Sequence, residues 1–435
     1  MGESDLSDNR QEPVINLISV NMGYGHQRAA YPLLCYSGRV LNIFGEDEDV
    51  KTNRFFWRLS QCSYNFLTRA ERIPLFGRLF FRLLEGVEKI EPYYPVRDQS
   101  GSTYQTRTIQ RIVENGMGKR FYQDLAGNGK PIVTTFFTSG FSAEKYTDLP
   151  VICIVCDADI NRAWVANRPE NSRIRYCAAS RSAARRLQAY GVPPERIHLT
   201  GFPLPQENIG DFMEILRRDT AYRIARLDPK GNFKRVHGTE AESELQVIPD
   251  ADVSRSPVTV TFAVGGTGAQ KEMAADILEG LKPGLESRRV HLNLVAGIRE
   301  DVYRYFIRLL AKKQYSCFSG VRIVYAPDLI SYFTEFNRIL RNTDILWSKP
   351  SELSFYCGLG LPVVMAPGIG PQEEGNREWL IGTGAGLAQK DPRYCSEWIM
   401  DWMDDGVLAG AAWNGYRNVE KNGVSNIIRI AKSAM

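Results

Sequence analysis

Twice in this chain a short apolar run leads directly into a glycine-rich turn and then into a helical pattern. The first run, 14–20, is followed by NMGYGH, and the second, 258–264, is followed by GGTGAQ. Short runs rich in β-branched residues that alternate with amphipathic stretches are typical of parallel α/β sheets, whose ligands lie at the carboxyl ends of the strands. The sequence therefore predicts two doubly wound, Rossmann-like α/β domains that face a cleft.

Further strand-like runs extend this pattern and set the expected boundaries of the domains. Residues 211–256 lose the periodicity and are polar, which predicts a linker or surface excursion, and 394–435 read as helical. We therefore expect an N-terminal domain over 1–210 and a C-terminal domain over 257–393. The additional expected strands are 131–137, 151–156, 291–296, 322–325, 344–347 and 362–365.

Composition narrows the class of protein. The chain has 435 residues with a net charge of +4, which is too balanced for a dedicated nucleic-acid binder, and 43% apolar residues, which argues against disorder. The acidic, polar start MGESDLSDNRQEP is no signal peptide, so we expect a cytoplasmic protein. Cys153 and Cys156 form a C-x-x-C within a run that reads as a buried strand, so no zinc site is expected.

The first turn carries a histidine at the start of a helical stretch. Gly23 and Gly25 would let the backbone approach a ligand closely, and His26 follows them. The positive end of a helix lowers the basicity of an imidazole, which favours the neutral form that a general base needs. The alternative is that His26 only caps the helix.

The second turn consists of Gly265, Gly266, Thr267 and Gly268. It matches neither a Walker loop nor G-x-G-x-x-G, because Lys271 stands where the third glycine belongs. Successive backbone N–H groups in such a turn still suit a diphosphate. The alternative is a tight turn required only for packing.

Six segments in order resemble one family. They are SVNMGYGHQRAA (19–30), VCDADINRAWV (155–165), GVPPERIHLTGFPLP (191–205), FAVGGTGAQ (262–270), YAPDL (325–329) and SKPSELSFYCGLGLPVVMAPGIGPQEEGNREWLIGTGAG (348–386). Together they resemble the lipid-directed GT-B glycosyltransferases of family 28: monogalactosyldiacylglycerol synthases, processive diacylglycerol glucosyltransferases and, more distantly, the lipid II GlcNAc transferase.

The resemblance implies a GT-B fold, with a nucleotide-sugar donor (expected to be a UDP-sugar) in the C-terminal domain and the acceptor in the N-terminal one. The turn 265–268 would hold the diphosphate and the loop at Ala326 the base. Gln372, Glu373 and Asn376 would bind hexose hydroxyls, since carboxylates accept and amides both donate and accept hydrogen bonds. Gly23, Tyr24 and Gly25 would line the acceptor site. Catalysis in this fold is usually metal-independent, so we expect no metal and no cofactor.

Two positions depart from the family pattern. Phe355 stands where the family has a ribose-binding glutamate, and Glu352, three residues earlier, takes that role only if the loop is rearranged. This departure puts a uridine donor in question. Tyr24 replaces a glycine and would narrow the acceptor cleft.

Asp157 and Asp159 spell D-x-D, the metal-binding element of the other glycosyltransferase fold, GT-A. The surrounding residues match GT-B, where this position faces the acceptor cleft. Asp157 is therefore a candidate to orient the acceptor or to support His26, and the alternative is a strand-end aspartate that caps the next helix.

Residues 51–90 form a basic, aromatic segment with eight basic and three acidic side chains. Arginine and aromatic residues on one helical face are typical of interfacial membrane helices. Such a helix would place the protein peripherally on the inner face of a membrane, next to a lipid acceptor. The alternative is an amphipathic helix that packs on its own domain.

These observations together predict a glycosyltransferase that moves a hexosyl group from a nucleotide-sugar to an acceptor hydroxyl, with His26 as the base. One alternative is a sugar-nucleotide epimerase of the same fold, which needs several carboxylates and histidines in the cleft, although the chain has only four histidines. The other alternative is a catalytically silent relative that only binds the nucleotide-sugar. The departures from the family pattern at Phe355 and Tyr24 support it.

Overall fold

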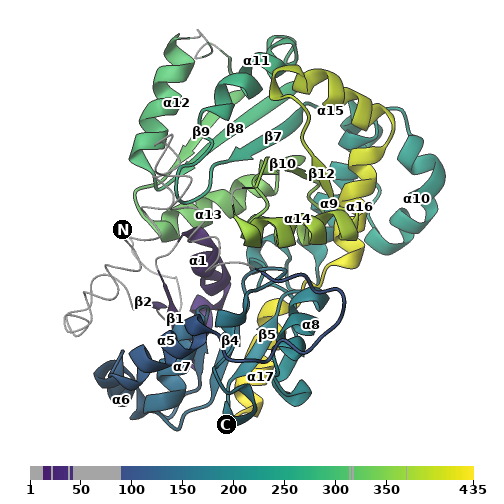
Figure 1. Cartoon of the computed structure of the whole chain (residues 1–435). Helices are drawn as coiled ribbons and strands as arrows, with labels where there is room; N and C mark the ends of the chain where they lie inside the picture. Colours follow the sequence, from purple (N-terminus) through teal and green to yellow (C-terminus); the bar gives the residue numbers. More distant parts are fainter. Residues whose placement is uncertain are drawn as a thin grey trace, which may run out of the picture.

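The computed structural model describes residues 13–20, 23–37, 40–42, 90–312, 315, 318–368 and 370–435. This part of the chain forms two lobes, each built on one parallel sheet with helices packed around it (Figure 1). The two predicted α/β domains are therefore confirmed. The amphipathic segment 51–90 lies outside the described residues except for its last position.

The N-terminal lobe holds a sheet of order β2-β1-β3-β4-β5-β6, six-stranded within the described residues, and every neighbouring pair is parallel. Its strands read as nearly continuous apolar runs because helices cover the sheet. The strands are β1 (Asn16–Ser19), β2 (Val40–Asn42), β3 (Ile132–Thr134), β4 (Val151–Ile154), β5 (Arg175–Ala178) and β6 (Ile197–Leu199). The helices are α1 (Tyr24–Ala30), α2 (Leu34–Ser37), α5 (Tyr104–Glu114), α6 (Lys119–Ala126), α7 (Phe137–Tyr146) and α8 (Arg181–Ala189), with the 3₁₀ helices η1 (Tyr31–Leu33), η3 (Arg162–Trp164), η4 (Pro169–Asn171), η5 (Pro194–Arg196) and η6 (Gln206–Asn208).

The C-terminal lobe repeats this architecture with a parallel sheet of order β12-β11-β10-β7-β8-β9, again counted over the described part of the chain. The strands are β7 (Val258–Ala263), β8 (Val290–Gly297), β9 (Val321–Tyr325), β10 (Ile345–Ser348), β11 (Val363–Met365) and β12 (Gly386–Ala388). The helices are α9 (Glu214–Leu227), α10 (Asn232–Leu245), α11 (Met273–Glu286), α12 (Glu300–Lys312), α13 (Leu329–Leu340), α14 (Pro371–Thr383), α15 (Cys395–Asp404) and α16 (Val407–Asn418), with the 3₁₀ helices η7 (Ala251–Arg255), η9 (Glu352–Leu359) and η10 (Pro392–Tyr394). The last helix of the chain, α17 (Gly423–Ser433), packs on the N-terminal lobe.

The strands expected from apolar runs all occur, with bounds within two residues of the expected ones, except that β3 ends at Thr134, three residues before the expected end of the run 131–137. Cys153 lies in β4 and Cys156 directly after it, and both are buried free thiols, as the buried-strand interpretation requires. Local apolar runs were enough to locate these strands, although β9 is only partly buried.

The range 211–256, expected to be a linker, is mostly helical. It forms α9 and α10, and α9 is anchored to the C-terminal lobe by Arg223, which is only 1% exposed. Its guanidinium donates to four backbone carbonyls, those of Leu340, Thr343, Leu359 and Gly360. The apolar periodicity is interrupted here because a charged residue, Arg223, and a polar one, Thr220, are buried among the apolar residues of α9.

The C-terminal residues 394–435 form three helices, and the last of them returns to the first lobe. The Asn426 side chain donates to the carbonyl of Thr200 at 3.1 Å, and Gly423 lies against the carbonyl of Phe202. In Figure 1, α17 accordingly lies beside α8 and β5, whereas α16 lies beside α9 in the other lobe. The chain therefore crosses between the lobes a second time, between α16 and α17.

Replacing Arg223 tests whether α9 belongs to the core. We expect Arg223→Met to lower the free energy of unfolding by about 3 kcal/mol, because four buried carbonyls lose their donor. Arg218→Met on the same helix is the control: Arg218 is exposed, so we expect a change within about 0.5 kcal/mol. Equal urea midpoints for the two variants would show that α9 is only loosely attached.

Candidate functional site

The predicted site residues follow the strands at which each sheet changes direction. In the N-terminal sheet the order reverses between β1 and β3, and in the C-terminal sheet between β7 and β10. Ligands of doubly wound sheets bind in the crevice at the carboxyl ends of such strands. His26 follows β1, the turn 265–268 follows β7, and Glu352 follows β10. The two crevices meet, because Gly266 lies against Gly23 and Tyr24.

His26 is held as a neutral imidazole by the strand next to β1. Its Nδ1 lies 2.7 Å from the carbonyl oxygen of Thr135, and its ring packs edge-on against Phe136. A carbonyl only accepts hydrogen bonds, so Nδ1 carries the proton and Nε2 keeps its lone pair. Burial lowers the pKa of His26 to about 4, opposed by the Thr135 bond and by the charge of Glu352. The direction is the one expected, but burial, not the helix end, is the main cause.

Asp157 lies after β4 and is tied to the other lobe. The Asn376 amide donates to its carboxylate at 3.0 Å, and the amide oxygen accepts the N–H of Ala158 at 2.7 Å. Burial raises the pKa of Asp157 to about 6, and the nearby charges of Glu352 and Glu373 raise it further. Asn376, expected to bind a hexose, therefore links the two lobes in this structure.

Lys349 is a site residue that sequence reasoning missed. It follows β10 and forms an ion pair with Glu373, the residue expected to bind sugar hydroxyls. Its chain passes so close to Gly265 that a Cβ at that position would lie 2.9 Å from Lys349 Cε. A lysine directly after a buried strand was the available signal. Its ammonium brings positive charge to the turn predicted to hold a diphosphate.

Glu352 is engaged by a second residue that the sequence did not single out, Arg28 of α1. Arg28 is 2% exposed, and its Nε donates to Glu352 at 3.1 Å. Gly25 packs against the same carboxylate, since a Cβ there would lie 3.6 Å from Glu352 Oε2. Glu352 thus lies near His26, and any contact to a ribose would compete with this pair.

Phe355, at the position of the family's ribose-binding glutamate, is fully buried. Its ring stacks on that of Phe202, with 4.9 Å between the ring centroids and an interplanar angle of 7°. Its centroid lies 4.8 Å from that of the Trp379 ring. Phe202 belongs to the N-terminal lobe, so this position serves packing between the lobes.

The remaining residues predicted to bind the donor belong to the C-terminal lobe. Gly268 closes the turn by donating to the carbonyl of Gly265 at 2.8 Å, and its φ of +74° favours glycine. The expected continuity with a helix is absent, because α11 begins only at Met273. Thr267 and Gln372 are half-buried, and Ala326 is buried with its N–H bonded to the carbonyl of Gly297.

The two carboxylates of the D-x-D motif have different partners. Asp159 accepts two hydrogen bonds from the Arg186 guanidinium, at 2.8 and 2.7 Å, whereas Asp157 accepts from Asn376. Among the residues described, no group of three or more His, Cys, Asp or Glu side chains is arranged to hold a metal ion.

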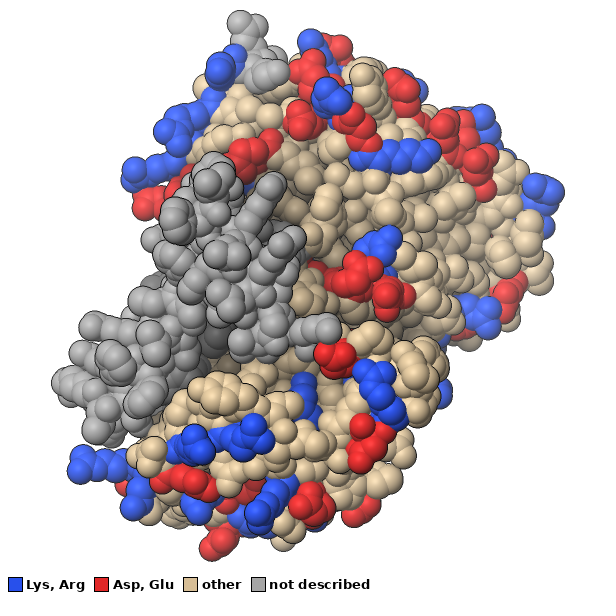
Figure 2. All heavy atoms as spheres, in the orientation of Figure 1, with Lys and Arg blue, Asp and Glu red and all other residues tan. Residues whose placement is uncertain are grey.

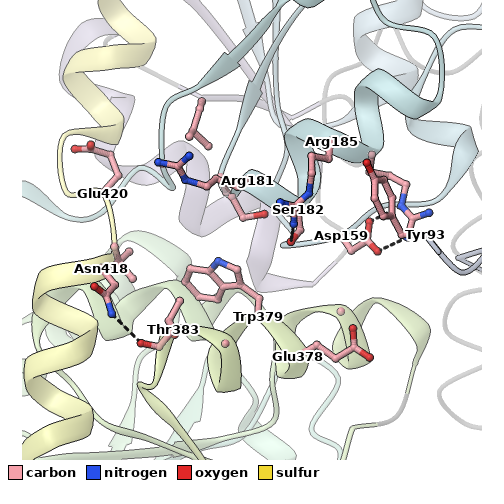
Figure 3. Close-up of a pocket in the computed structure, with 18 of the residues that line it drawn as sticks. Tyr93, Asp159, Arg181, Ser182, Arg185, Glu378, Trp379, Thr383, Asn418 and Glu420 are labelled. Carbon is pink, nitrogen blue, oxygen red and sulfur yellow. Dashed lines mark hydrogen bonds and ion pairs between the residues drawn. The ribbon is translucent and has the colours of Figure 1, made fainter. Parts of the chain in front are cut away.

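A groove of about 1370 Å³ lies between the lobes and is lined in part by α14. Figure 3 shows Arg181 and Ser182 of α8 across from Trp379 and Glu378 of α14. At 100° per residue, the groove residues Glu374 and Glu378 lie on the opposite face of α14 from Glu373 and Asn376. The groove is therefore separate from the cluster around His26.

The visible surface carries mixed charge. Figure 2 shows basic and acidic side chains interspersed over both lobes on this face. In the described portion, no helix combines the length and the apolar character that a membrane crossing requires.

The titration of His26 gives the stability of the fold a pH dependence of known sign. Its pKa is about 4 in the fold against an ordinary value of 6.5, so between these two values only the unfolded chain binds the proton. The contribution of neutral His26 to the free energy of unfolding is therefore fully present above pH 6.5 and is lost as the pH falls toward 4. We expect His26→Gln to remove up to about 3 kcal/mol of this acid destabilisation, measured by urea unfolding at pH 7 and about 4.5.

Asp157 provides the control of opposite sign. Its pKa is raised from 3.8 to about 6, so its contribution is lost as the pH rises from about 4 to about 6. Asp157→Asn should therefore make stability rise more steeply with pH than in the wild type. Identical pH dependence for wild type and His26→Gln would contradict the assignment of a buried, neutral His26.

Comparison with known proteins finds similarity only at the level of solved structures. No family model and no curated protein sequence matches the chain. The UDP-GlcNAc 2-epimerase from Neisseria meningitidis bound to UDP-GlcNAc is similar at 13% identity and a TM-score of 0.42, over 78% of this chain and 83% of that one. The S. aureus MnaA–UDP co-structure is similar at 10% identity and a TM-score of 0.45, over 95% of this chain and 93% of that one. The glycosyltransferase SnogD from Streptomyces nogalater is similar at 12% identity and a TM-score of 0.45, over 96% of this chain and 99% of that one. At these values the likeness carries no inference about function.

Proposed function

We propose that this chain is a GT-B glycosyltransferase that moves a hexosyl group from a nucleotide-sugar, with UDP as the expected nucleotide, to an acceptor hydroxyl. The observation that carries the proposal is the meeting of the two sheet crevices, which brings the turn before the neutral, oriented His26 into contact with the glycine turn 265–268. A transferase needs both a base and a cradle for the leaving diphosphate in one place.

His26 would act as the base. Its Nε2 lone pair would take the proton of the acceptor hydroxyl as the acceptor oxygen bonds to the anomeric carbon. The Thr135 carbonyl fixes the tautomer, and the negative charge of Glu352 favours the imidazolium that forms. Asp157 lies after β4, the neighbour of β3 in the same sheet, and would help to orient the acceptor.

The C-terminal lobe would stabilise the leaving group. The bond between the anomeric carbon and the diphosphate breaks with its electron pair on the phosphate oxygen, which needs donors and positive charge. Backbone N–H groups of the turn 265–268 and the Lys349 ammonium, which lies close to Gly265, would supply them. Glu373, bound to Lys349, and Gln372 would contact the hexose hydroxyls.

The acceptor class rests on sequence. The family resemblance and the basic, aromatic segment 51–90 support a lipid acceptor reached from a membrane surface. Vesicle sedimentation tests it: binding to anionic vesicles at low salt that is lost at high salt supports the proposal.

A second candidate is a sugar-nucleotide epimerase. Epimerisation needs groups that remove a proton from the sugar and return it to the other face, and Glu352 and Glu373 lie close enough to Asp157 for their charges to raise its pKa. The two reactions separate in one experiment. An epimerase converts its nucleotide-sugar with no acceptor present, whereas a transferase requires one.

The deciding experiment starts with binding. Thermal-shift screening against UDP-, GDP- and ADP-sugars identifies the donor, and incubation of that donor with lipid extract reveals the product by mass spectrometry. A wild-type chain that binds a donor but transfers nothing to any acceptor would contradict the transferase proposal and favour the silent relative.

Replacing His26 tests the base. We expect His26→Ala to lower transfer at least 100-fold while donor-induced stabilisation persists, because the imidazole acts on the acceptor proton. His237→Ala is the matched control: His237 lies exposed on α10, and its loss should leave the rate unchanged. Comparable transfer rates for the two variants would remove His26 from the mechanism.

A further inference from the structure

Tyr24 belongs to the N-terminal lobe by sequence, but its ring is embedded in the C-terminal lobe. The side chain is 7% exposed, and its centroid lies 5.1 Å from that of Tyr332 and 6.3 Å from that of Phe333, both on α13. The phenol oxygen accepts the backbone N–H of Ile298 at 3.0 Å. The C-terminal lobe thus offers a slot for a planar ring with one acceptor oxygen.

Gly297 gives this slot its depth. Its φ of +67° favours glycine, and a Cβ built there would overlap the Tyr24 hydroxyl. Gly297 ends β8, the neighbour of β7, so the slot lies at the carboxyl edge of the same sheet as the turn 265–268. Its carbonyl accepts the N–H of Ala326, from the loop expected to contact the base.

The backbone of Tyr24 also covers the glycine turn. A Cβ on Gly266 would lie 3.2 Å from the Tyr24 nitrogen and 3.3 Å from Gly23 Cα, so the turns of the two lobes are in direct contact. A diphosphate does not fit between backbones at this separation. The Tyr24 ring therefore occupies the slot, and the backbone of Gly23 and Tyr24 occupies the space over the turn.

We propose that Tyr24 is an internal competitor for the nucleotide-sugar: the chain fills its own donor site with a tyrosine, and donor binding requires Tyr24 to leave the slot. The inference rests on the proposed function. A pyrimidine resembles the phenol in being planar and in presenting an oxygen acceptor to a backbone N–H, so the slot chemistry is shared. A ligand that binds only the state in which Tyr24 has left the slot has a lower apparent affinity, because only that fraction of the molecules is competent to bind it.

Removing the ring tests the proposal. We expect Tyr24→Ala to bind UDP at least tenfold more tightly than the wild type in isothermal titration, and Tyr24→Phe to show a smaller gain because only the hydrogen bond is lost. Tyr31→Ala is the matched control. Tyr31 contacts Phe333 and Thr334 of the same helix but lies outside the slot, so its loss should not change UDP affinity.

p-Cresol provides an independent readout of the slot. It should bind and stabilise Tyr24→Ala but not the wild type, and compete with UDP there. Equal UDP affinity in wild type and Tyr24→Ala would overturn the competitor while leaving nucleotide binding intact. If no variant binds UDP, the proposed function fails, and p-cresol then decides alone: binding to Tyr24→Ala supports a ring slot, and no binding overturns it.

Discussion

The arrangement of the two lobes depends on one buried charge, the Arg28 guanidinium. A charge removed from water is tolerated only when it is paired, and Arg28 finds its partner, Glu352, in the other lobe. Five aromatic rings surround the guanidinium within 6 Å, those of Tyr24, Tyr332, Phe333, Phe336 and Tyr356. Because Arg28 lies two residues after His26 on α1, pairing it across the interface also fixes where His26 stands.

Much of the fold follows from local sequence. The strands were predictable because each run is short and mostly apolar, which leaves little freedom of interpretation. The same locality placed His26, Asp157 and the turn 265–268 at strand ends. Parallel sheets bring carboxyl ends together, so residues far apart in sequence converge on one edge. Which of these residues take part in chemistry stays a prediction.

The rest depends on partners that no local pattern reveals. No local pattern singles out Arg28 or Lys349, and their pairing becomes visible only when the fold brings them to Glu352 and Glu373. Residues 211–256 read as a linker because α9 turns a charged arginine, Arg223, toward backbone carbonyls. Phe355 read as a lost ligand, but it stacks on Phe202 of the other lobe.

The proposed function requires that a nucleotide-sugar bind where the two sheet crevices meet. A crystal structure of the chain with a bound UDP-sugar tests this claim most directly. The account predicts the diphosphate on the turn 265–268 near Lys349, with Tyr24 out of its slot and His26 Nε2 facing the sugar. A nucleotide bound elsewhere, for example in the groove on the opposite face of α14, with Tyr24 still against Ile298, would contradict it.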